Sequence, residues 1–425
     1  MNKKIVFVFV IGIIFVFAAL VMVRSFFLKP SDAAHVAAIP EGEYDPAVWG
    51  RRYSLQYASF QKNLEMSASP TDFGGSVKFQ HSLRQSEILT NFKGNAFSKD
   101  YTEDRGHPYS LTDLKESKRV TPQTPGACMT CKTANIPDIF KELGWSYANK
   151  PLAELFAESK HAIGCANCHN PLTMELRVTN PAFVEAMAKR GIDVTKAPRE
   201  EMRTYVCGQC HAEYYFEPGT SRVIMPWDKG FHPEQIYAYY STKPGGFEGD
   251  WVQPDSQAIM LKAQHPDFEV YSAGTHARLG ISCADCHMPY MREAGRKYSS
   301  HRVTSPMKTT DASCRRCHPE DAKMLLERVR AGQKNVWELQ HIAGTRISKA
   351  HEAISRVITS KTINKEDLDK AREHLRRAHW YWDFVAAENS MGFHNPALCL
   401  NILGQSIDLA HRAAESAALA TGPVP

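Results

Sequence analysis

The chain has 425 residues, of which 43% are apolar and 23% are charged, and its formal net charge is +5. This length is enough for one large domain or two, and no low-complexity stretch or second linker divides it. The modest charge gives no support for nucleic-acid binding, so no nucleic acid is expected among the partners. The 11 cysteines are the more informative feature.

Residues 1–45 are expected to form a membrane anchor or signal segment followed by a tether. The letters MNKK precede an uncharged apolar run at residues 5–23, which as a helix would span roughly 28 Å of a hydrocarbon core about 30 Å thick. Small residues at Ala33 and Ala34 leave cleavage by a signal peptidase open, although an uncleaved anchor is favoured. Both interpretations place residues 46–425 in the periplasm or another extracytoplasmic compartment.

Five Cys-x-x-Cys motifs account for ten of the 11 cysteines. In such a motif the two thiols can form thioethers to the vinyl groups of a haem, while the following residue folds back onto the iron. Zinc or a disulfide would explain one isolated pair, but four pairs that are each followed by His favour haem. The pattern therefore predicts five covalently bound c-type haems. The motif residues are Cys128, Cys131 and Lys132; Cys165, Cys168 and His169; Cys207, Cys210 and His211; Cys283, Cys286 and His287; and Cys314, Cys317 and His318.

The predicted fold is mainly α, with haems replacing much of the usual core. Residues 40–310 carry many Pro, Gly, Asn and Asp residues between short helical pieces, and few alternating strand patterns. Apolar spacing then predicts long helices over residues 321–360, from an N-cap at Asn364 to about residues 389–392, and from about Pro396. We interpret residues 46–425 as one pentahaem catalytic domain.

Some residues of the late helices are expected to have ordinary packing or surface roles. Cys399 lies in an apolar stretch and is predicted to be a buried packing residue. The histidines of these helices are expected on exposed or packing faces, where surface roles are favoured. They are His351, His374, His379 and His411.

Lys132 distinguishes the first motif from the other four. A lysine amine must lose its proton to bind iron, so ligation requires strong suppression of its basicity. The alternative is a degenerate motif in which Lys132 faces solvent and another residue binds the iron. Enzymes with several haems often reserve one of them for substrate, which favours ligation by Lys132.

Two further segments carry groups suited to a metal ion or a substrate. Glu213 begins EYYF after the third motif, and Lys262, Gln264 and His265 lie in KAQHP. Carboxylate, amide and carbonyl oxygens are the ligands that calcium prefers, and His265 beside them could donate protons to a substrate. A surface Glu, a packed Tyr and another distal haem ligand are the plainer alternatives.

Taken together, these residues resemble cytochrome c nitrite reductase, the five-haem, ammonia-forming family. The resemblance covers about residues 75–415. It rests on CMTCK followed by four CxxCH motifs, and on the segments RGH at 105–107, Arg119 in ESKR, CGQCHAEYYF at 207–216, MLKAQHP at 260–266, AGTHARLGISCADCHMP at 273–289 and FHNP at 393–396.

The resemblance implies a role for each matched residue. Lys132 would be the proximal ligand of the catalytic haem, with Arg119, Tyr214 and His265 around its open face. Calcium would be bound by the side chains of Glu213 and Gln264 and by the backbone carbonyls of Tyr214 and Lys262. The distal ligands of the second-, third-, fourth- and fifth-motif haems would be His301, His107, His394 and His276, respectively.

The resemblance also implies an activity and partners. The expected reaction is the six-electron reduction of nitrite to ammonium at a Lys-ligated haem, fed by four bis-His haems. A membrane quinol-oxidising cytochrome would donate the electrons, and residues 320–425 would form a homodimer. Two rival functions stay open: reduction of hydroxylamine or sulfite, and electron transfer alone with every haem six-coordinate.

Overall fold

The computed structural model describes residues 38–421, except residues 104 and 361. The chain divides into two units, Met1–Ile39 and Pro40–Pro425, and the second holds all five motifs. The apolar run predicted at residues 5–23 lies outside the described residues. Among the helices that the structure does describe, none is long and apolar enough to cross a membrane.

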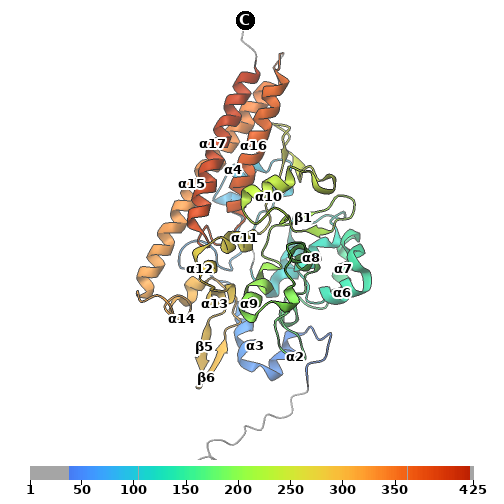
Figure 1. Cartoon of the computed structure of the whole chain (residues 1–425), viewed down its shortest axis with the longest axis vertical. Coiled ribbons are helices and arrows are strands. Elements are labelled where there is room, and N and C mark those ends of the chain that lie inside the picture. The colour runs from blue at the N-terminus through green and yellow to red at the C-terminus, as the bar shows by residue number, and fades with distance from the viewer. Residues whose placement is uncertain (1–37, 104, 361, 422–425) are drawn as a thin grey trace, which may run out of the picture. The chain divides into compact units, whose positions relative to one another are not determined.

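The second unit is built mainly from helices, as expected (Figure 1). Short helices joined by irregular segments carry the five motifs, and three long helices follow. The short helices are α2 (Pro46–Arg52), α3 (Ser54–Gln61), α4 (Glu87–Asn91), α5 (Ser110–Glu116), α6 (Ile136–Leu143), α7 (Leu152–Glu158), α8 (Pro181–Lys189), α9 (Arg199–Gly208), α10 (Pro233–Tyr240), α11 (Asp267–Ser272), α12 (Thr275–Arg278), α13 (Cys283–His287) and α14 (Thr310–Ser313).

Sheet is limited, in the described residues, to three antiparallel two-stranded hairpins. Each hairpin is a local connection, and none forms a layer on which helices could pack. The strands are β1 (Tyr215–Phe216) with β2 (Val223–Ile224), β3 (Trp251–Val252) with β4 (Ile259–Met260), and β5 (Tyr290–Glu293) with β6 (Arg296–Ser299).

The long helices α15 (Ala322–Ile358), α16 (Lys365–Ala386) and α17 (Pro396–Ala420) pack lengthwise against one another (Figure 1). Each begins at a polar cap whose side chain accepts a backbone N–H of the first turn: Asp321, Asn364 and Asn395. The three predicted helices are confirmed, and so is the predicted N-cap at Asn364. The second ends a few residues earlier than expected, at Ala386.

The three long helices enclose a core of packed side chains, and the histidines in that core correct one expectation. Cys399 is fully buried, as predicted. His351 and His379 are also fully buried, so their expected surface role was wrong. His351 lies on α15, which packs on α4 as well as on α16 and α17, and His379 lies on α16, which packs on β4 and α10 as well as on α15 and α17. More than one face of each helix is therefore buried.

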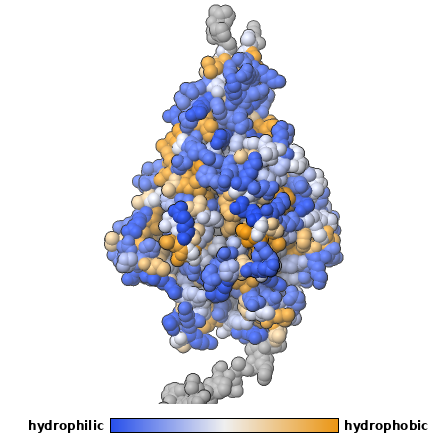
Figure 2. Space-filling model, viewed as in Figure 1, coloured by the Kyte–Doolittle hydropathy of each residue, from blue (hydrophilic) through white to orange (hydrophobic). Residues whose placement is uncertain are grey.

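Figure 2 shows apolar side chains gathered along one flank of the long helices, on a surface that is otherwise largely hydrophilic. Exposed apolar residues on these helices include Met324 and Ile342 of α15 and Leu419 of α17, which are 52%, 48% and 68% exposed. Apolar residues gathered in one exposed region are typical of contact surfaces.

Candidate functional site: a cavity lined by thiols and imidazoles

A connected cavity of about 1470 Å³ lies among the short helices. Its wall carries the cysteines of the first four motifs and also Lys132, Arg119, Tyr214 and His265. Protein interiors are close-packed, with few voids larger than a water molecule, so a cavity of this size requires an occupant. Paired thiols and imidazole nitrogens are the donor set that attaches and ligates c-type haem. The residues present therefore fit haem.

Three histidines of CxxCH motifs each face a second imidazole across a nearly constant gap. The ring centroids lie 6.1 Å apart for His169 and His301, 6.3 Å for His287 and His394, and 6.3 Å for His318 and His276. Metal–imidazole bonds of about 2 Å on both sides of one iron require a centroid separation of about 6 Å. Each pair therefore has the spacing of two axial ligands.

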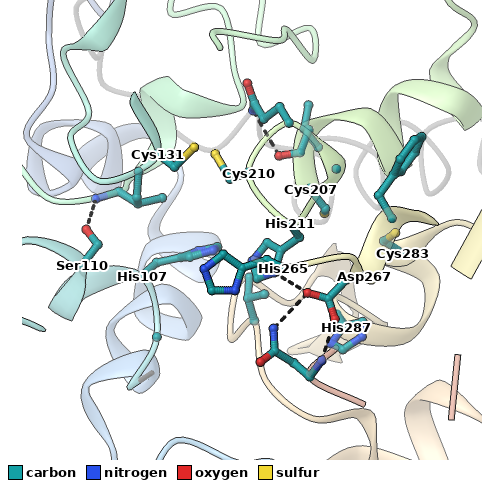
Figure 3. Close-up of a pocket in the computed structure, with 18 of the residues that line it drawn as sticks. His107, Ser110, Cys131, Cys207, Cys210, His211, His265, Asp267, Cys283 and His287 are labelled. Atoms are coloured by element: carbon teal, nitrogen blue, oxygen red, sulfur yellow. Dashed lines mark hydrogen bonds and ion pairs between the residues drawn. The ribbon is translucent and has the colours of Figure 1, made fainter. Parts of the chain in front are cut away.

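The fourth predicted pair lies at the centre of the cavity. Figure 3 shows His107, His211 and His265 gathered there. Burial, together with the neighbouring His211 and Lys132, lowers the pKa of His107 to about 4, so its imidazole is neutral at pH 7. A neutral imidazole is the form that binds iron.

The outer nitrogen of most of these imidazoles has an acceptor. The Nδ1 atoms of His169, His287 and His301 lie 2.9, 3.0 and 2.9 Å from backbone carbonyl oxygens. A donated Nδ1–H fixes the tautomer and directs Nε2 at the metal. The carbonyls belong to Met174, Thr304 and Ser299, respectively.

His211 and His394 have carboxylates in the same position. His211 Nδ1 lies 3.2 Å from an oxygen of Asp267, and His394 Nδ1 lies 2.5 Å from an oxygen of Glu388. Sequence reasoning missed both acids, because the chain carries Asp267 on α11 and Glu388 just after α16 without any spacing that links them to the motifs.

Cysteines of different motifs also meet. The thiols of Cys131 and Cys210 lie beside each other, which brings the first motif next to the third (Figure 3). Cys207 of the third motif lies beside Cys283 of the fourth. The fourth motif lies near the fifth through Cys286. Motifs one, three, four and five therefore follow one another in space, an order that the sequence did not reveal.

Arg119 and Tyr214 line the wall beside the first motif. Arg119 Nε donates to Ser117 Oγ at 3.3 Å. In the part of the chain that the structure describes, Nε is the only guanidinium nitrogen of Arg119 with a hydrogen bond to protein. Burial raises the pKa of Tyr214 far above that of an ordinary phenol, so Tyr214 keeps its proton.

The predicted calcium residues lie in a buried acidic region. Glu213 accepts the Tyr240 hydroxyl at 2.8 Å and the backbone N–H of Gln264 at 2.6 Å. The Lys262 ammonium pairs with Asp383 at 3.0 Å, and the Lys262 backbone N–H donates to Asp250. Glu213 and Gln264 are thus brought together with the backbone of Lys262.

Carboxyl groups outnumber cations in this region. Glu213, Glu269 and Asp383 are all buried, and Lys262 is the cation among them. Burial raises the pKa of Glu269 to about 8. Carboxylates held in such surroundings are typical of a site that receives a divalent cation.

A mainly helical fold around a cavity of paired thiols and paired imidazoles defines a multihaem c-type cytochrome. The cytochrome c552 family model matches residues 45–422. Because the match spans nearly the whole chain, this protein belongs to the cytochrome c552 family, which confirms the expected fold class.

Named relatives agree with this assignment. Cytochrome c nitrite reductase subunit NrfA of Nitratidesulfovibrio vulgaris is 38% identical over 406 residues, which cover 87% of this chain and 77% of that protein. Cytochrome c-552 of Aliarcobacter butzleri is 34% identical over 428 residues, covering 97% and 84%. The expected resemblance to the nitrite reductases is therefore confirmed.

A solved structure gives the same result. Cytochrome c nitrite reductase NrfA of Desulfovibrio desulfuricans, described with two calcium sites in its catalytic subunit, matches with a TM-score of 0.85 and 35% sequence identity. The match covers 91% of this chain and 88% of that one. The chain is thus an oxidoreductase of the multihaem cytochrome class.

Proposed function

We propose that this protein reduces nitrite to ammonium, with six electrons and eight protons per nitrite, beside Lys132. The observation that carries the proposal is a contrast between the motifs. Four motif histidines have a second imidazole as neighbour, whereas Lys132 shares the cavity wall with Arg119, Tyr214 and His265. A haem held at Lys132 would supply electrons and an open iron position to a small anion.

The side chains of the pocket suit nitrite. Arg119 carries a permanent positive charge, and its two terminal nitrogens have no protein hydrogen bond among the described residues, so they are available to the oxygens of an anion. His265 provides a second hydrogen-bond donor and a proton donor. Tyr214 keeps its phenolic proton and can donate it as a hydrogen bond. The buried surroundings strengthen each of these interactions.

The proposed haem residues follow the motif order. Lys132, His169, His211, His287 and His318 would be the proximal ligands of five covalent haems. His301, His107, His394 and His276 would complete the second-, third-, fourth- and fifth-motif sites. Support comes from the ring separations near 6 Å in three of these pairs and from the burial of His107 beside His211.

One calcium ion would stabilise the loop that carries Tyr214. The proposed ligands are the side chains of Glu213 and Gln264 and the backbone carbonyls of Tyr214 and Lys262. Support comes from the excess of buried carboxylates around Glu213. The ion would orient the Tyr214 side chain rather than touch substrate.

The expected partners follow from the same proposal. The protein would act outside the cytoplasm, with a membrane quinol-oxidising cytochrome as electron donor, and two copies would associate through the C-terminal helices. The exposed apolar side chains of α15 and α17 support that association.

Product analysis tests the proposal. The purified holoprotein, with reduced viologen as donor, should convert nitrite to ammonium in equal molar amounts. Accumulation of nitric oxide without ammonium would contradict the six-electron reaction. The oxidised protein should also give a high-spin signal from one haem of the five. Wholly low-spin spectra would instead favour the electron carrier.

A further inference from the structure

The Nδ1 nitrogens of the proposed axial imidazoles have two kinds of acceptor. Three of them, on His169, His287 and His301, face neutral backbone carbonyls. The Nδ1 atoms of His211 and His394 instead lie 3.2 and 2.5 Å from the carboxylates of Asp267 and Glu388. In Figure 3, the dashed line from His211 to Asp267 marks the first of these contacts.

Both carboxylates are enclosed by protein. Asp267 is 7% exposed and Glu388 is 2% exposed. Asp267 also lies between the two imidazoles, since its other oxygen is 3.9 Å from His394 Nδ1. A negative charge on Asp267 is therefore poorly screened by solvent and acts on both imidazoles.

The hydrogen bonds of the two acids suit the ionised form. Asp267 accepts the backbone N–H of Asn389 at 2.9 Å and its side-chain amide at 2.9 Å. Glu388 accepts the backbone N–H groups of Ser390 and Gly392 at 3.1 and 3.0 Å. Each of these partners is a donor, so neither carboxyl needs a proton to satisfy its neighbours.

We propose that Asp267 and Glu388 are potential-setting residues, which make the third- and fourth-motif haems stronger reductants than the second-motif haem. The inference deepens the proposed function, because it rests on the proposed ligands His211 and His394. A carboxylate on Nδ1–H makes the imidazole a more basic ligand and favours the oxidised iron. A buried negative charge disfavours an added electron in the same direction. Both ligands of the second-motif haem, His169 and His301, face carbonyls only.

The position of the third motif connects this difference in potential with the proposed reaction. Cys210 of the third motif meets Cys131 of the first, beside Lys132. An electron held weakly at the third-motif haem is therefore next to the proposed nitrite pocket. The two acids favour delivery of electrons to the pocket over their storage along the way.

Potentiometric titration of the complete holoprotein, without nitrite and followed by electron paramagnetic resonance, tests the proposal. Asp267→Asn should raise the potential of one low-spin haem strongly and of a second one weakly. Glu388→Gln should raise the potential of that second haem. The control Asn389→Ser removes one donor to Asp267 without changing charge and should leave the potentials as in the wild type.

Unchanged potentials in Asp267→Asn with all five haems bound would overturn the inference, as would an equal shift in Asn389→Ser. If Asp267→Asn does not mature, Glu388→Gln decides in the same way. The wild-type titration decides without any variant, since one common potential for every low-spin haem would contradict the proposal. Absence of paired low-spin haems in the wild type would count against the proposed ligands themselves, which is a different failure.

Discussion

The guanidinium carbon of Arg119 lies 4.1 Å from the centre of the Phe97 ring. This contact positions a flexible side chain, because a cation over an aromatic face is attracted to it and has less freedom. A second contact comes from Ser117, whose hydroxyl accepts Arg119 Nε and donates to the buried carboxylate of Asp100 at 3.0 Å. Asp100 also accepts the backbone N–H of Lys118 at 2.7 Å. Arg119, which is proposed to bind nitrite, is thus held by two contacts.

Ser117→Ala should raise the KM for nitrite by roughly 5- to 30-fold, because Arg119 loses a hydrogen bond that fixes its direction. The KM for hydroxylamine, which is mostly uncharged near neutral pH, should rise much less. Steady-state kinetics with both substrates on one preparation make the comparison. Ser117→Thr keeps the hydroxyl and should behave nearly as wild type. Equal losses for the two substrates would indicate general damage and contradict this role.

Lys132→His should keep all five covalent haems, since Cys128 and Cys131 are unchanged and the motif becomes an ordinary CxxCH. Nitrite turnover should fall, because imidazole replaces an amine at the proposed catalytic iron. Haem content per chain and ammonium formation are measured together. A fully loaded variant with wild-type turnover would show that the lysine is not functionally important.

Glu213→Gln should weaken calcium binding by at least roughly tenfold, because a neutral amide replaces a charged ligand. Nitrite turnover should fall with the calcium content, and added calcium should restore part of it. Metal analysis of dialysed protein gives the readout. Glu217→Gln, four residues along the same loop, is the matched control. Full calcium content in Glu213→Gln would mean that the ion is held elsewhere.

The stability of the C-terminal bundle should fall in acid through His351. Burial lowers its pKa to about 3, against a slight opposing effect of Asp255, whereas an unfolded histidine titrates near ~6.5. Its contribution is therefore complete above pH ~6.5 and is lost as the pH falls toward about 3. His351→Gln should reduce the pH dependence of unfolding between these limits by up to about 1.4 kcal/mol per pH unit.

Urea unfolding, followed by circular dichroism from pH 7 to 4.5, measures this slope. His411→Gln changes a histidine of α17 that is 67% exposed and is the matched control. An unchanged slope in His351→Gln would show that other groups govern the acid sensitivity.

Local sequence signals predicted the elements that depend on local chemistry. The cap at Asn364 and the apolar spacing of residues 321–360 gave the helices, because capping and periodicity act within one element. The five motifs predicted the haem-binding residues for the same reason. The burial of His351 and His379 was missed, since periodicity does not reveal how many neighbours a helix has.

The spatial arrangement of the site residues could not be predicted from the sequence and was seen only in the structure. The separation of His169 from His301, and of Asp267 from Glu388, is set by how distant segments pack. Sequence spacing carries no information about such pairs, and the resemblance supplied only the proposed ligands. The two acids and the spatial order of the motifs were beyond both kinds of reasoning.

The pairing of His287 with His394 also constrains how the protein is made. His394 follows α15 and α16, so the two imidazoles meet only after both helices have been synthesised and have folded back onto the motif region. Closing so long a loop is slow relative to local folding. With the proposed ligands, a haem attached to Cys283 and Cys286 on an emerging chain would therefore have one axial ligand until the long helices fold. The proposed electron path would then be complete only after the bundle has formed, and not when the last motif has been synthesised.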